Sequence, residues 1–149
     1  MNRPTISIPR FIIRALSRAG FVNILEPNIF GPVERLHLSK TELGLPVESA
    51  GTMNTLFNTM SGEIWVGDDT FFGHNVMLIT GKHYDGGDDL YRNAFVKEGR
   101  DIRIGKNCWI CSGVIIPCSV TIGDNCTIRA GAIVTKDVPN NTTVSGIWK

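Results

Sequence analysis

The most regular feature of this chain is an apolar residue that returns at every sixth position in its C-terminal third. The members of this first series are Ile104, Ile110, Ile116, Ile122, Ile128 and Val134. A second apolar series follows the first after four positions and consists of Cys108, Val114, Val120, Cys126, Ala132 and Val138. A period of six fits neither a helix nor a single alternating strand, so we expect both series to face one interior.

The period predicts a solenoid with three short strands per coil, because three repeats of six make a coil of eighteen residues. Residues eighteen positions apart then lie in neighbouring coils, about 4.8 Å from each other, which is the spacing of paired strands. The expected stacked pairs are Ile104 with Ile122, Ile110 with Ile128, and Ile116 with Val134. Such ladders form one continuous apolar core.

Glycine and short polar residues stand where the coils must turn. Gly105, Asn107, Gly123, Asp124 and Asn125 fall at the expected corners. These residue types are favoured where a turn needs positive φ. The local chemistry therefore agrees with the six-residue period.

The same frame extends backwards, but its phase breaks once. The upstream members are Val66, Phe72 and Leu78, with Ile64, Thr70 and Val76 at the secondary position. Leu78 and Ile104 are 26 positions apart, which is not a multiple of six. The break must lie in residues 83–101, a polar and glycine-rich stretch without the period. Long irregular loops in compact domains are usually functional, so we predict an inserted active-site loop here.

The length of 149 residues predicts one domain, residues 1–149, with four parts. These parts are an N-terminal helical segment (1–30), irregular first coils (31–82), the inserted loop (83–101) and regular coils (102–146).

The N-terminal segment has the pattern of an amphipathic helix over residues 8–19. Arg10, Arg14 and Arg18 share one helical face, while apolar residues face the other side. We interpret this helix as a cap across the open end of the solenoid, in preference to a helix on a membrane surface.

The charge balance excludes a strong electrostatic partner. Lys and Arg number 15 against 14 Asp and Glu, so no overall field draws the chain to nucleic acid or to an acidic membrane. No apolar run approaches the eighteen or so residues of a membrane span. Arginines interrupt the apolar stretch near the N-terminus, which argues against a signal peptide. We therefore expect a soluble, cytoplasmic protein.

Four cysteines, Cys108, Cys111, Cys118 and Cys126, are expected to be reduced thiols, because the chain is not a small secreted scaffold. Their spacing contains one C-x-x-C but no second pair, and no histidine follows Cys108. We therefore expect no metal site.

Two segments of the chain resemble a known family. They are VGDDTFFGHNVMLITGKH and IGKNCWICSGVIIPCSVTIGDNCTIRAGAIVTKDVPNNTTVSG, and their specific parts are GKH before the loop, NCWI, and AGAIVTKDVP. The match, over about residues 60–146, is to the hexapeptide-repeat acyltransferases, in particular galactoside, maltose and polysaccharide O-acetyltransferases.

The resemblance implies an all-β fold, a left-handed parallel β-helix with a short N-terminal helix and an inserted loop. It also implies a homotrimer with active sites between subunits, which transfers an acetyl group from acetyl-CoA to a hydroxyl of a sugar or similar small acceptor.

Acyl transfer from a thioester to a hydroxyl needs a base for the hydroxyl proton and donors for the tetrahedral oxyanion. His83 stands where the coil gives way to the loop and matches the catalytic histidine of the family, so we assign it as the general base. His74 is interpreted as a packed or exposed residue near a corner. His37 receives no role.

The resemblance implies a set of cofactor-binding residues. Ser112 and Ala130 match positions that offer backbone N–H groups, and because they are eighteen apart one should stack above the other. Thr135 and Lys136 match a T-K pair near the CoA phosphates, where lysine acts as a point charge. Trp109 matches a tryptophan beside cofactor and acceptor, and its outward position requires contact with the cofactor or with a neighbouring subunit.

The acceptor-binding residues are expected before the first clear coil and in the loop. The family uses an asparagine near residue 58, and we favour Asn58 over Asn54 for this role. In the loop, Asp85, Tyr91 and Arg92 are candidates for contact with the acceptor.

Two other functions compete with O-acetylation. The same site could acylate the amine of an amino sugar, and assays with both kinds of acceptor would separate these activities. A non-catalytic scaffold is the alternative from another class. His83, the phase-breaking loop and the T-K pair argue against it, because a scaffold needs none of them.

Overall fold

The chain folds into a solenoid of short parallel strands. The structure, a computed structural model, describes residues 28–38, 54–83, 96, 98–117 and 119–149. Within these residues, helix is confined to one 3-10 turn, η1 (Val33–Arg35), and every strand pairing is parallel. The expected all-β class is therefore confirmed.

The strands form three sheets, which we call I, II and III. Sheet I contains β1 (Asn28–Phe30), β3 (Leu56–Asn58), β6 (Met77–Ile79), β9 (Ile115–Ile116), β12 (Ile133–Val134) and β14 (Ile147–Trp148). Sheet II contains β2 (Leu36–Leu38), β4 (Ile64–Val66), β7 (Ile102–Ile104) and β10 (Val120–Ile122). Sheet III contains β5 (Phe71–Phe72), β8 (Trp109–Ile110), β11 (Thr127–Ile128) and β13 (Thr143–Val144).

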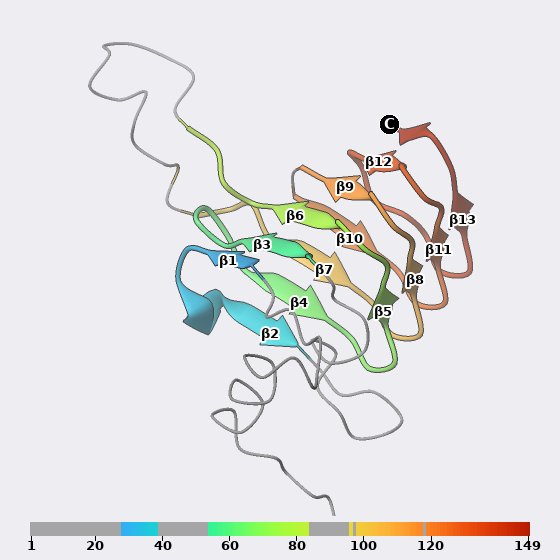
Figure 1. Cartoon of the computed structure of the whole chain (residues 1–149), viewed down its shortest axis with the longest axis horizontal. Helices are drawn as coiled ribbons and strands as arrows, with labels where there is room; N and C mark the ends of the chain where they lie inside the picture. Colours follow the sequence, from blue (N-terminus) through green and yellow to red (C-terminus); the bar gives the residue numbers. More distant parts are fainter. Residues whose placement is uncertain (1–27, 39–53, 84–95, 97, 118) are drawn as a thin grey trace, which may run out of the picture.

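Each regular coil passes through sheet II, sheet III and sheet I in that order, and the coils stack along one axis (Figure 1). Three edges separate the sheets. The II–III edge consists of residues 67–70, 105–108, 123–126 and 139–142. The III–I edge consists of residues 73–76, 111–114, 129–132 and 145–146. The I–II edge includes residues 59–63, 80–83, 98–101, 117 and 135–137.

The predicted aliphatic ladders are present in the core. Ile104 pairs with Ile122, and Ile110 pairs with Ile128. These four side chains are at most 3% exposed. Since burial of one such side chain is worth roughly 1.5–3 kcal/mol, the stacked rows supply the main stabilisation of the coils.

The predicted break in phase is also present, between the coil of β4, β5 and β6 and the coil of β7, β8 and β9. Leu78 pairs with Ile116, 38 positions later, instead of eighteen. The difference is an insertion of 20 residues, which leaves sheet I after Ile79 and returns to sheet II at Ile102. The insertion therefore occupies the I–II edge without disturbing the ladders above and below it.

The last coil is shorter than the eighteen-residue repeat predicts. Val138 is buried as expected, but it forms a bridge with Ile122, sixteen positions away. The turn that follows Val134 therefore has two residues fewer than the equivalent turn below it. The Asp137 carboxylate compensates, because Oδ1 accepts a 2.7 Å hydrogen bond from the backbone N–H of Thr121.

The corner residues divide into two physical roles. Asn107 and Asn125 have the positive φ expected at the corners, 54° and 57°, and their side chains form a hydrogen-bonded ladder, with 2.8 Å between Nδ2 and Oδ1. Gly105 and Gly123, by contrast, do not have the positive φ that was expected at these corners. A Cβ at either glycine would collide with the coil above, so close approach requires them.

Some expectations lie outside the described residues, including the capping helix at 8–19. In the part of the chain that the structure describes, no helix has the length and apolarity needed to cross a membrane.

We predict that Ile110→Ala lowers the free energy of unfolding by about 2–5 kcal/mol, because it removes a fully buried rung between Phe72 and Ile128. Thr121→Ala, on the exposed face of β10, should change it by about 0.5 kcal/mol or less. Urea unfolding followed by circular dichroism measures both. Equal losses would contradict the ladder as the main source of stability.

Candidate functional site

The predicted site residues lie on two different edges of the same chain. Ser112 and Ala130 are on the III–I edge, whereas His83 is on the I–II edge. Sheet I separates these edges with three to five residues of extended chain, roughly 10–16 Å. A base must come within about 3 Å of the proton it removes. One chain therefore does not bring its own His83 to its own Ser112.

The III–I edge presents a column of backbone N–H groups. The Ser112 N–H has no hydrogen-bond acceptor among the described residues. The Ala130 N–H, one coil above, lies beside the Cys111 sulfur, which is a weak acceptor. Gly113 and Gly131 follow these residues with φ of 71° and 70°, the left-handed geometry that turns the chain here. The two amides therefore stack at a turn. The Ser112 N–H is available to a ligand, whereas the Ala130 N–H is held only by a weak sulfur acceptor.

Ser112 also forms hydrogen bonds with the III–I edge of the coil below it. Its Oγ accepts a 3.1 Å hydrogen bond from the backbone N–H of His74, and the His74 carbonyl accepts one from Gly113 at 2.8 Å. His74 therefore contributes its backbone to the edge, in agreement with its interpretation as a corner residue.

Trp109 lies on the outer face of sheet III, close to the III–I edge, and is 49% exposed as its outward position predicts. Its ring stacks on Phe71, with 5.5 Å between centroids and 26° between planes. The two rings form an exposed apolar ledge along one side of the amide column.

At the I–II edge, the structure brings Asn58 to the stem that carries His83. Thr80 donates both its N–H and its hydroxyl to the Asn58 carbonyl, at 3.0 and 2.8 Å. The Asn58 side chain accepts the Met60 N–H at 3.1 Å and lies against Gly81, where a Cβ would come within 2.7 Å of Oδ1. His83 itself is exposed, two residues beyond this contact.

Thr135 and Lys136 follow sheet I at the same edge, two coils above His83. The Thr135 hydroxyl donates to the Trp148 carbonyl at 3.0 Å. The Lys136 ammonium lies 5.4 Å from the centroid of the Trp148 ring. Both residues are exposed. Asp85, Tyr91 and Arg92 lie outside the described residues.

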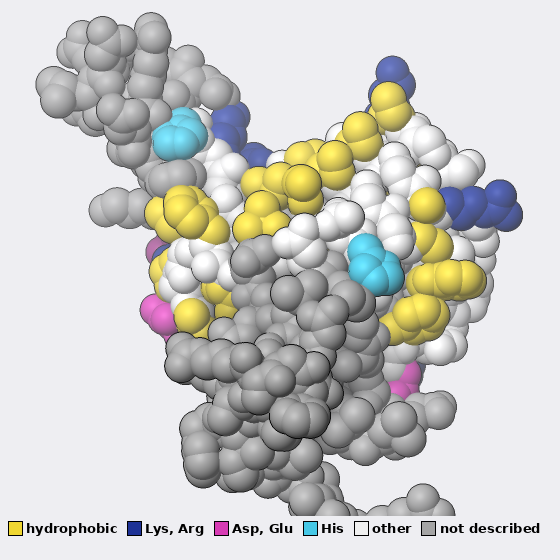
Figure 2. Space-filling view, in the orientation of Figure 1, with side chains coloured by type: hydrophobic (Ala, Val, Ile, Leu, Met, Phe, Trp, Pro, Cys, Tyr) yellow, Lys and Arg dark blue, Asp and Glu magenta, His cyan; other side chains and the backbone are white. Residues whose placement is uncertain are grey.

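The outer face of sheet I carries an aliphatic stripe. The paired residues that form it are Leu56, Met77, Ile115, Ile133 and Ile147. Met77 is 39% and Ile147 is 65% exposed. Figure 2 shows a continuous apolar row over this sheet, rising toward the C-terminal end. This face joins the two edges that carry the predicted site.

Comparison with known proteins agrees with this architecture. Residues 101–136 match the family model described as bacterial transferase hexapeptide (six repeats). The matched stretch carries the hexapeptide repeats of this transferase family.

Several curated proteins are similar to the chain. Nodulation protein L of Rhizobium meliloti is 48% identical over 84 residues, 56% of this chain and 45% of that protein. The galactoside O-acetyltransferase of Lactococcus lactis is 38% identical over 84 residues, 56% of this chain and 40% of that protein. The chain thus spans less than half the length of these curated relatives.

A solved structure extends the likeness over more of the chain. The maltose O-acetyltransferase from Clostridium difficile superimposes with a TM-score of 0.59 at 32% identity, over 78% of this chain and 57% of that one. The expected left-handed parallel β-helix is thereby confirmed.

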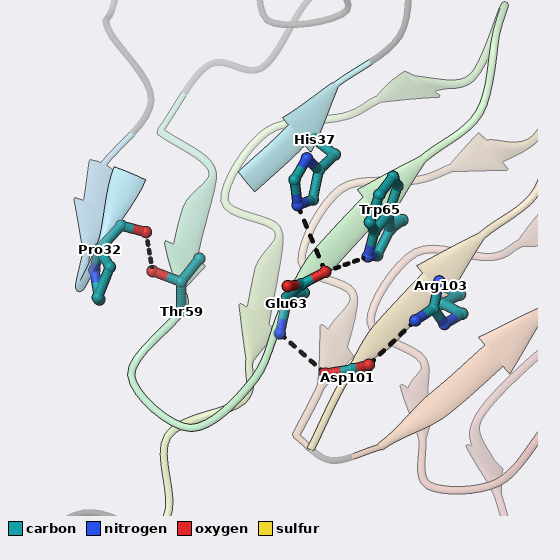
Figure 3. Close-up of polar contacts among 7 residues, drawn as sticks. All are labelled: Pro32, His37, Thr59, Glu63, Trp65, Asp101 and Arg103. Atoms are coloured by element: carbon teal, nitrogen blue, oxygen red, sulfur yellow. Dashed lines mark hydrogen bonds and ion pairs between the residues drawn. The ribbon is translucent and has the colours of Figure 1, made fainter. Parts of the chain in front are cut away.

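The solenoid also carries a polar and aromatic cluster that the sequence pattern did not predict. Figure 3 shows His37, Trp65 and Arg103 on three neighbouring strands of sheet II. The His37 and Trp65 rings stack at 3.7 Å, and the Arg103 guanidinium lies 5.4 Å from the Trp65 centroid. Glu63 Oε2 lies 3.4 Å from His37 Nε2. Their sequence offsets of 28 and 38 are not multiples of the repeat, which explains why the pattern concealed them.

The partly buried thiol of Cys111 lies beside the Ala130 N–H on the III–I edge. Burial raises its pKa, against smaller opposing effects of the Ala130 N–H and the Arg129 charge. Burial also raises the pKa of Cys108, which packs in the core. Cys111 is therefore a neutral thiol at this edge and not a thiolate.

We predict that alkylation of Cys111 by iodoacetamide is slow at neutral pH and continues to accelerate above pH 9, because the raised pKa keeps the thiol protonated to higher pH. Tandem mass spectrometry of time points across a pH series measures the rate, with the urea-unfolded chain as control. A rate that reaches its plateau below pH 8 would show an activated thiolate instead.

Proposed function

We propose that this domain transfers an acetyl group from acetyl-CoA to a hydroxyl of a sugar or similar small acceptor, with His83 as general base. The observation that carries the proposal is the stacked pair of amides at Ser112 and Ala130, on the edge that a neighbouring chain's histidine edge can face. The names of the relatives, galactoside and maltose O-acetyltransferase, support acetyl transfer to a sugar hydroxyl.

The proposed chemistry needs one proton carrier and one oxyanion site. His83 accepts the hydroxyl proton while the acceptor oxygen forms a bond with the thioester carbonyl carbon. The Ser112 N–H donates to the oxyanion of the tetrahedral intermediate. The intermediate collapses as the carbon–sulfur bond breaks, and the imidazolium returns its proton to the leaving CoA sulfur. The products are the acetyl ester and free CoA.

The remaining contacts hold the two substrates. Ala130 offers its N–H to the amides of the pantetheine arm, one coil above Ser112. Trp109 covers the same groove from sheet III. Thr135 and Lys136 lie on the I–II edge, so in the assembly they come from the subunit that supplies His83, and the ammonium interacts with CoA phosphates as a point charge. Asn58, beside the stem of His83, holds the acceptor hydroxyl with its amide, and Asp85, Tyr91 and Arg92 are assigned to the acceptor as well.

The separation of the two edges requires a second copy of the chain, and we assign the assembly as a homotrimer. Three copies that bury sheet I around an axis parallel to the solenoid place the I–II edge of one subunit beside the III–I edge of the next. Coils of equal number are then level, so His83 and Ser112 of the neighbouring subunit differ in height along the axis by about one coil, ~4.8 Å. The exposed stripe of Met77, Ile115 and Ile147 supports burial of this face.

We predict that His83→Ala lowers kcat by about 10²–10⁴, because positioned proton transfer contributes that much to the rate. The Kd for CoA should stay within about twofold, since in the proposed mechanism His83 holds neither the pantetheine arm nor the phosphates. Steady-state kinetics with a hydroxylated sugar and with an amino sugar measures these effects and identifies the acceptor atom.

A loss of less than about tenfold with a good acceptor would remove His83 as the base. His74→Ala is the matched control, because the two backbone hydrogen bonds of His74 with Ser112 and Gly113 are kept in this variant. Absence of any CoA binding by the wild-type chain would favour the scaffold function instead.

A further inference from the structure

We propose that Arg100 is a positioning residue for the general base, because its guanidinium fixes the height of the His83 stem relative to the coil that carries Ser112. This inference rests on the proposed function. Arg100 lies at the end of the inserted loop, where the chain returns to sheet II. Nothing in the six-residue period distinguishes it from the other polar residues of the loop.

The Arg100 side chain connects two coils through backbone carbonyls. Nε donates to the Thr80 carbonyl at 2.8 Å, and a terminal nitrogen donates to the Pro117 carbonyl at 3.0 Å. Thr80 begins the stem that leads to His83. Pro117 directly follows β9, the strand that comes after Ser112 in the next coil. A single planar guanidinium therefore holds the outgoing stem against the next coil.

The backbone of Arg100 belongs to the same clamp. Its N–H donates to the Ser61 carbonyl at 3.2 Å, while Ser61 Oγ accepts the Lys82 N–H at 3.1 Å. The Ser61 N–H in turn donates to Thr80 Oγ1 at 3.2 Å. Gly62 allows this approach, because a Cβ there would lie 2.7 Å from the Arg100 carbonyl oxygen.

These bonds act on the position of His83 more than on the core. The aliphatic ladders do not pass through the I–II edge, so the clamp contributes little to core packing. By contrast, Lys82, the residue before His83, is held through Ser61 and through its own carbonyl, which accepts the Val96 N–H at 2.8 Å. A displacement of about 1 Å at a reacting group can cost about 10²-fold in rate. Loss of the guanidinium should therefore move the base away from its productive position.

The test compares Arg100→Ala with Arg103→Ala in the full chain. Arg103 is the matched control, because it lies three residues away and contacts Asp101 and Trp65 on the exposed face of sheet II. We expect Arg100→Ala to lower kcat by about 10–100-fold with little change in the KM for acetyl-CoA. Arg103→Ala should leave both nearly unchanged.

The double variant Arg100→Ala, His83→Ala separates positioning from general stability. If Arg100 acts through His83, its removal should cost nothing further once His83 is absent. Millimolar ethylguanidinium should restore part of the lost rate to Arg100→Ala alone. Arg100→Lys keeps one charge without the planar fork, and should recover only part of the activity. If Arg100→Ala does not fold, the same comparisons are made with Arg100→Lys.

Equal values of kcat for Arg100→Ala and Arg103→Ala would overturn the inference. So would a fall in kcat on adding Arg100→Ala to His83→Ala that is as large as the fall in the wild-type background. Failure of the proposed function has a different signature. In that case His83→Ala would turn over as fast as wild type, whatever Arg100 does.

Discussion

The stacking of identical aliphatic positions in successive coils is the interaction on which the rest of the structure depends. Each rung, such as Ile110 between Phe72 and Ile128, buries its whole side chain only because the coils above and below repeat its position. Such packing does not allow the position of the buried residue to shift from coil to coil. Protein interiors are close-packed, so one misplaced side chain leaves a void or a clash. Variation is therefore confined to the edges.

The edges accommodate that variation in different ways. At the I–II edge the chain inserts 20 residues between two coils and then resumes the ladder in register. At the end of the solenoid, where the turn after Val134 is two residues shorter, the Asp137 carboxylate accepts the hydrogen bond from the Thr121 N–H. The II–III edge stays regular, with the asparagine ladder of Asn107 and Asn125. The rigid faces hold these edges at fixed heights, which is the condition that a split active site requires.

The sequence predicts the core well because a six-residue period is strong and local, and every rung from Ile104 to Val134 is buried as expected. It also locates the insertion from the break in phase after Leu78. It does not reveal contacts between segments whose spacing departs from the six-residue period. Examples are the contacts of Arg100 with Thr80 and Pro117 and the contact of His37 with Trp65. These contacts can be predicted only once the 28- and 38-residue offsets between paired strands are known.

The candidate site shows the same division. The outward position of Trp109 and the stacking of Ser112 with Ala130 follow from the repeat, and the structure agrees with both. The assignment of His83 came from resemblance, since no period marks it. The separation of His83 and Ser112 on two edges could not be read from spacing, because it depends on the order in which the coil visits the three sheets.

Subunit complementation tests the central claim, that one chain supplies the base and its neighbour the oxyanion donor. His83→Ala chains retain the Ser112 amide, and Ser112→Pro chains retain His83 but lack that N–H. The two variants are unfolded together in equal amounts and refolded, and acetyl transfer is measured against each variant refolded alone. With random mixing of subunits, about one quarter of the interfaces combine an intact His83 with an intact Ser112, so about a quarter of the wild-type rate should return. No gain over the separate variants, in mixed oligomers verified by native mass spectrometry, would contradict a site shared between subunits.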